Sequence, residues 1–144
     1  MHIDYLNLFS DGQAVTASAA ASFDLDLGPI KGTRRDIGVG EPLYLFVNVA
    51  TTAAAAGAAT LNVQLQTSEN GSSWTTIYDS GSVALAKLVA GSRIVAAPVP
   101  MGVKKYLRLN YVVGTGPLTA GAFTAGLVVD LDANDPYPSN FVVA

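Results

Sequence analysis

The sequence predicts an all-β fold: an antiparallel β-sandwich of the jelly-roll type, with about eight strands and extended termini. Apolar and polar residues alternate along several short segments, as in strands that bury one face. Turn signals such as Gly28-Pro29, Asn70-Gly71 and Ser80-Gly81 separate these segments at intervals of ~8–12 residues. This spacing is typical of sandwiches and barrels, and eight antiparallel strands in two sheets make a jelly roll. We expect less than ~15% helix.

The most regular alternation lies in residues 104–132, which read as two long strands joined by a segment rich in glycine and proline. We expect the two strands to pair as a hairpin with a protruding loop. Their shared apolar face would be buried against a second layer, because a lone hairpin is not stable in water. The residues expected on that face are Leu107, Leu109, Tyr111, Phe123, Leu127 and Val129.

The rest of the chain is divided into an N-terminal arm (1–21), the sandwich (22–132) and an extended C-terminal tail (133–144). The arm shows no clear pattern, and the tail contains two prolines. The alanine-rich segment 51–59 is expected to be a flexible connection, because four alanines do not hold a helix in water. Further strands are expected around Phe23–Leu27, Leu43–Val49, Leu61–Gln66, Thr75–Tyr78 and Arg93–Ala97.

The composition excludes several classes of function. The 144 residues fit one domain. They include no cysteine and one histidine, so the side chains needed for a thiol nucleophile or a zinc site are missing. A net charge of −3 argues against nucleic acid as a partner. No apolar run is long enough for a membrane span, and the first residues lack the order of a signal peptide. We therefore expect a non-enzymatic protein with no cofactor and no catalytic residues, made in a reducing cytoplasm.

Two groups of residues are candidate chemical sites. His2 is at a terminus, where a catalytic imidazole would not be held rigidly, so an incidental role is favoured. Asp130, Asp132 and Asp135 match a calcium loop in part, but the loop's glycine and its distant bidentate acid are missing. We favour solvated carboxylates there, with a metal site as the weaker alternative.

Two further features have both a functional and a structural interpretation. Lys31, Arg34 and Arg35 form a basic cluster that either docks an acidic partner or is a solvated loop, and neither is preferred. Trp74 would be a sugar-stacking platform if exposed. A core or sheet-edge position is favoured, because large aromatic side chains are mostly buried.

Three segments together resemble a known family. They are Arg35–Tyr44, Lys105–Tyr111, and Gly114–Pro117 with Thr119–Gly121. Their order and spacing resemble the jelly-roll cement, or decoration, proteins on the capsids of tailed bacteriophages, and the resemblance extends from about Phe9 to Asp132. It implies a protein of the virion exterior that binds the outside of the shell, bridges neighbouring major capsid subunits and self-associates. A homodimer is the default for self-association, and the resemblance also allows a homotrimer.

Two other classes stay open beside this one. A carbohydrate-binding or receptor-binding module of a phage tail or fibre would present Trp74 and nearby tyrosines to solvent. An enzyme of the sandwich type would need a second histidine or a complete pair of carboxylates in a pocket.

Apolar residues near both ends are the expected contacts with the capsid. At the N-terminus they are Tyr5, Leu6, Leu8 and Phe9, and at the C-terminus they include Phe141. The alternative is that both ends fold back on the sandwich. Partner contact is favoured for the N-terminus because the small, polar stretch 13–22 can act as a tether, and neither interpretation is preferred for the C-terminus.

Overall fold

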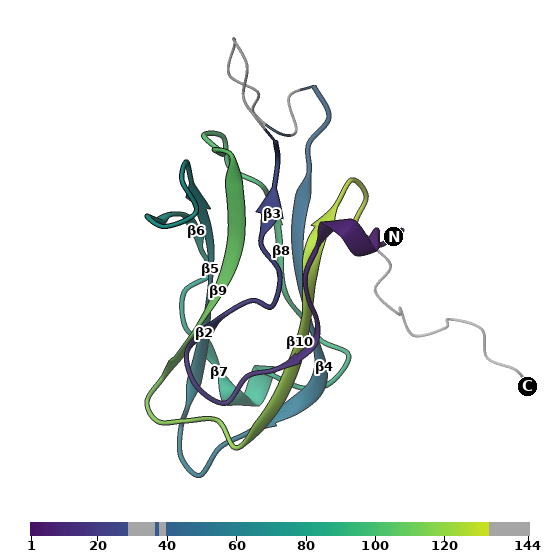
Figure 1. Cartoon of the computed structure of the whole chain (residues 1–144). Coiled ribbons are helices and arrows are strands. Elements are labelled where there is room, and N and C mark those ends of the chain that lie inside the picture. The colour runs from purple at the N-terminus through teal and green to yellow at the C-terminus, as the bar shows by residue number, and fades with distance from the viewer. Residues whose placement is uncertain (29–36, 38–39, 133–144) are drawn as a thin grey trace, which may run out of the picture.

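Two antiparallel β-sheets pack face to face in this protein (Figure 1). The computed structural model describes residues 1–28, 37 and 40–132. The strands are β1 (Leu8–Ala14), β2 (Ala19–Ala20), β3 (Leu25–Asp26), β4 (Tyr44–Ala54), β5 (Thr60–Ser68), β6 (Thr75–Asp79), β7 (Val83–Ala84), β8 (Arg93–Pro98), β9 (Tyr106–Gly114) and β10 (Ala120–Val128). Two 3-10 turns, η1 (Tyr5–Asn7) and η2 (Leu85–Lys87), are the helical segments of the described ranges. No helix in those ranges has the length and apolar character to cross a membrane.

The strand order identifies a jelly roll. One sheet has the order β1-β10-β4-β8, and the other has the order β2-β9-β5-β6. In the second sheet β3 continues the edge that β2 begins along β9, and β7 continues the edge that β6 begins along β5. If each interrupted strand is counted once, the two sheets hold four strand positions each, and the chain passes repeatedly from one sheet to the other. This is the jelly-roll arrangement, so the predicted fold class is confirmed.

The core lies between the sheets and follows the predicted alternation. Alternate residues of β5 and β9 face alternate residues of β4 and β10. The buried side chains on these strands include Leu45, Val47, Val49, Leu61, Val63, Leu65, Leu107, Leu109, Tyr111, Phe123, Ala125 and Leu127. Val129 was expected among them but is 54% exposed, because β10 ends at Val128 and the alternation ends with it.

The predicted hairpin is wrong. β9 and β10 belong to different sheets, and residues 115–119 cross from one sheet to the other. Their apolar faces meet across the core instead, with the rings of Tyr111 and Phe123 5.6 Å apart between centroids. Alternation specifies which face of a strand is buried, but it does not specify the neighbouring strand in the sheet.

Three further expectations about the early strands need correction. Residues 8–14, expected in the free arm, form β1. Backbone bulges in this strand interrupt the alternation of apolar and polar residues, so the sequence pattern does not reveal the strand. The alanines at 53 and 54 continue β4, because pairing with β10 outweighs their low strand propensity. Of the strand expected at 23–27, only β3 forms, and Phe23 and Leu27 remain partly exposed.

A small second cluster covers part of the outer face of the β1-β10-β4-β8 sheet. Leu8, Phe46 and Val128 are buried there, with Met1 and Leu131 packed against them. Gly126 lies between Leu8 and Phe46 in the strand register. This arrangement leaves no room for a side chain at position 126.

Gly126→Ala should therefore destabilise the fold by about 1–3 kcal/mol through overpacking. A Cβ atom at this position would lie 2.9 Å from the Asn7 carbonyl oxygen, 2.9 Å from Leu8 Cδ2 and 3.2 Å from Phe46 Cε1. Gly57→Ala is the matched control, because nothing lies within 4 Å of its Cβ position. Urea denaturation of both variants tests this, and equal midpoints would contradict the packing described here.

The Tyr111 hydroxyl joins the two sheets through a buried hydrogen bond with Ser10 of β1, at 2.6 Å. Burial raises the pKa of Tyr111 from 10.0 to about 12, and the bond with Ser10 lowers it in part. The native state therefore holds the phenolic proton more tightly than the unfolded chain does. This contribution to stability is complete below pH 10 and is lost as the pH rises from about 10 to about 12.

Tyr111→Phe should be less stable than the wild type at neutral pH by about 1–2 kcal/mol, because Ser10 loses its buried partner. Its free energy of unfolding should also fall less steeply above pH 10. The advantage of the wild type in free energy of unfolding should fall by up to ~2.7 kcal/mol across the window, the equivalent of two pKa units, so the variant should become the more stable of the two near pH 12. Urea denaturation at several alkaline pH values measures the free energy of unfolding of both proteins. The difference between the two values removes the contribution of lysine titration, which both proteins share. Parallel pH profiles would refute the role assigned to Tyr111.

Candidate interaction surfaces

A cluster of exposed apolar side chains lies at the start of the chain. Asp4 caps η1, with its carboxylate accepting hydrogen bonds from the Leu6 backbone N–H at 3.0 Å and from Asn7 Nδ2 at 3.1 Å. This turn holds Tyr5 and Leu6 outward, at 67% and 78% exposure. η1 and the N-terminus lie beside β10, on the far side of the molecule from β6 (Figure 1).

Phe23 extends this cluster from a distant point in the sequence. Its ring meets the Tyr5 ring in an edge-to-face contact, with 6.3 Å between centroids. Its backbone N–H donates to the carbonyl of Phe9 in β1 at 2.9 Å, which fixes the segment against the sandwich. We refer to Ile3, Tyr5, Leu6 and Phe23, all at least 45% exposed, as the N-terminal patch.

The structure divides the predicted N-terminal contact residues into two groups. Tyr5 and Leu6 are exposed, whereas Leu8 and Phe9 are buried in the sandwich at 6% and 0% exposure and are not available to a partner. The sequence pattern does not reveal β1, so it does not separate these two groups. Phe23 alternates with polar residues in phase with Leu25, a pattern that indicates a buried face, so the sequence does not identify it as a contact residue. Lys31, Arg34, Arg35 and Phe141 lie outside the described residues.

Of the aspartates near position 130, Asp132 is bonded to other residues of the described part of the chain. The carboxylate of Asp132 accepts a hydrogen bond from the amino group of Met1, and this bond is the main reason that its pKa is lowered. Arg93 Nη1 donates to the Asp132 backbone carbonyl at 2.9 Å. Asp130 is exposed, and Asp135 lies outside the described residues. Among the residues described, no three acidic, histidine or cysteine side chains are grouped as ligands for a metal.

The outer face of the second sheet is polar and hydrogen-bonded. Gln64 of β5 accepts a hydrogen bond from Asn110 of β9 at 3.4 Å and donates to Asp79 of β6 at 3.0 Å. The pKa of Asp79 is lowered by its hydrogen bond from the Gly81 backbone N–H and then by the one from Gln64. Asn62 also donates to Asp79, at 3.3 Å. These side chains form a surface of amides and charges.

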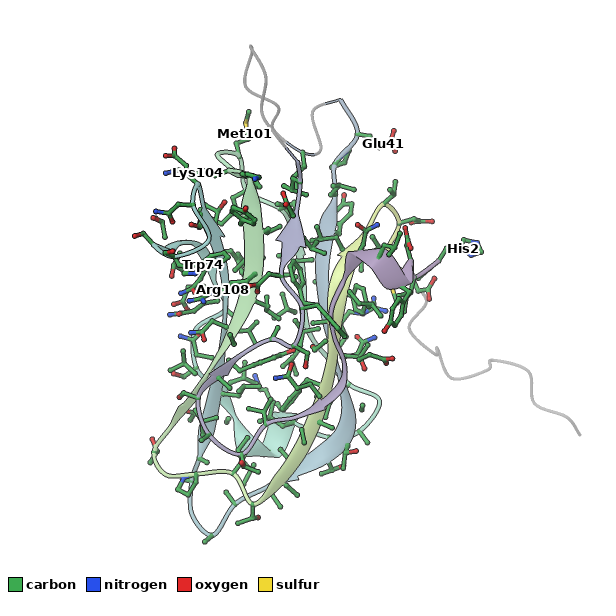
Figure 2. The ribbon with its side chains drawn as sticks, viewed as in Figure 1. His2, Glu41, Trp74, Met101, Lys104 and Arg108 are labelled. Carbon is green, nitrogen blue, oxygen red and sulfur yellow. The ribbon has the colours of Figure 1, made fainter. Side chains whose placement is uncertain are left out.

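Trp74 lies at the edge of this face and is half-buried. The guanidinium carbon of Arg108 sits over its ring, 4.1 Å from the centroid. Figure 2 shows Trp74 and Arg108 together on the side of β6 and β9, with His2 on the opposite side of the molecule. One face of the indole is thus covered by a cation, which leaves less of it free to stack on a sugar than the platform interpretation requires.

Comparison with known proteins places the chain in a family. The model of the Bbp16 family matches residues 9–127, most of the chain. No curated protein matches. Among solved structures, the chain is similar to the PBSX exported protein XepA, with 16% sequence identity and a TM-score of 0.47. The match covers 99% of this chain and 46% of that longer one, and it is too distant to inform function.

Proposed function

The chain belongs to the Bbp16 family, a phage-associated family, and from this premise we propose that it is a non-enzymatic structural protein of the virion. In this proposal it binds the outer surface of a tailed-phage capsid and cements neighbouring major capsid subunits. It is made in the cytoplasm of the host bacterium and functions on the capsid exterior.

The N-terminal patch is the observation that carries the proposal. Large apolar side chains exposed on a soluble surface mark contact sites when they lie together. Burying each one against a partner would contribute about 1.5–3 kcal/mol, and the capped η1 turn has already ordered two of them. A shell offers the same binding surface many times, so modest contacts add up through avidity.

Self-association is part of the proposal, because a protein that bridges subunits gains from presenting its patch more than once. A homodimer is the simplest symmetric form, and a homotrimer is the alternative. Chemical cross-linking of decorated capsids, followed by denaturing electrophoresis, should give dimers or trimers of the chain. A yield of monomers alone would reject this part of the proposal.

The double variant Tyr5→Ser/Leu6→Ser should bind undecorated capsids at least about 100-fold more weakly than the wild type. The estimate follows from the loss of two buried apolar side chains at the contact. Fold stability should change little, since both residues are exposed. Sedimentation of capsids with bound protein measures occupancy, and thermal unfolding checks the fold.

Met101→Ser is the matched control, because Met101 is 83% exposed and lies away from the N-terminal patch (Figure 2). It should bind capsids as the wild type does. Unchanged occupancy of the double variant would refute the patch as the contact. Failure of the wild type to bind capsids at all would refute the proposed function.

A further inference from the structure

The guanidinium of Arg108 is held in one orientation by two neighbours. Trp74 supports its plane through the cation–π contact at 4.1 Å, and Arg108 Nε donates a hydrogen bond to Gln66 Oε1 at 2.9 Å. Gln66 is fixed in turn, because its Nε2 donates to Thr76 Oγ1 at 3.2 Å. Strands β5, β6 and β9 therefore cooperate to position one surface arginine.

The two terminal nitrogens of Arg108 have no partner among the described residues. Neither Nη1 nor Nη2 donates a hydrogen bond there, and Arg108 forms no ion pair with the described carboxylates. Every buried side-chain nitrogen or oxygen in the described ranges has a partner, so these two reach solvent. A planar guanidinium with both terminal groups free is matched to a carboxylate, which it binds through two parallel hydrogen bonds. Because its neighbours already hold it, binding would cost little side-chain entropy.

The surroundings of Arg108 favour a sugar acid over an acidic protein side chain. The amides of Gln64, Gln66 and Asn110 offer donors and acceptors that suit hydroxyl groups. In the described part of the chain, none of the exposed large hydrophobic residues lies on β5, β6 or β9. Protein interfaces depend on exposed apolar anchors, and the aromatic ring beside Arg108, that of Trp74, is half-buried with the guanidinium over it.

We propose that Arg108, supported by Trp74 and Gln66, binds the carboxylate of a uronic acid in an acidic saccharide, while the neighbouring amides bind its hydroxyl groups. In this arrangement Trp74 supports the arginine and is not itself a sugar-stacking platform. The site does not depend on the proposed capsid contact. It lies on the side opposite His2 and the N-terminus, so a molecule attached through the N-terminal patch would leave it open (Figure 2).

The test is calorimetric titration of the full chain with trigalacturonate at constant ionic strength. The wild type should bind it. The methyl ester of the same trisaccharide, which lacks the charge, should bind at least about tenfold more weakly. Arg108→Lys keeps the charge but loses the planar pair of donors, and it should also weaken binding by about tenfold. Lys104→Ala, which removes an exposed cation that pairs with Glu69 at 3.4 Å, is the control and should leave the affinity within about twofold.

Several results would overturn the proposal. The proposal is wrong if the wild type does not bind trigalacturonate. It is also wrong if the methyl ester binds equally well, or if Arg108→Lys keeps the wild-type affinity. A triglutamate peptide that bound as tightly as trigalacturonate would show that the site recognises carboxylates without regard to sugar. Thermal unfolding of Arg108→Lys confirms that its fold is intact. None of these results depends on capsid binding, so each proposal can fail alone.

Discussion

The contact of Tyr111 with the opposite sheet is the constraint on which the structure depends. Its ring packs against Phe123 of β10, and its hydroxyl is hydrogen-bonded to Ser10 of β1. One side chain of β9 thereby joins the two strands at one edge of the other sheet. β9 and β10, though consecutive in the chain, lie in different layers, and their apolar faces meet across the core.

Closing the core in this way leaves two outer surfaces with different chemistry. On the β1 side, the N-terminal segment carries exposed aromatic and aliphatic side chains. They remain exposed because β1, which is buried as far as Ser10, already occupies the sheet edge beneath this segment. On the β9 side, long polar side chains satisfy one another and position a single guanidinium. The first surface suits a protein partner, and the second suits a hydrated, charged ligand.

Sequence patterns predicted the fold well and the surfaces poorly, for physical reasons. The alternation of Leu61, Val63 and Leu65 identified a buried strand face, because a period of two depends on neighbours in the chain. The bulges of β1 interrupt that period, so the sequence pattern does not show that Phe9 is buried. The pairs Tyr5–Phe23 and Trp74–Arg108 join residues far apart in sequence, and no local pattern encodes them.

Image reconstruction of capsids with and without the purified protein tests whether the chain decorates the outside of a phage shell. We expect added density the size of one sandwich at each junction between neighbouring major capsid subunits over the whole shell. The end that carries η1 should face the capsid. Density confined to a single vertex or to the tail, or no added density at all, would contradict it.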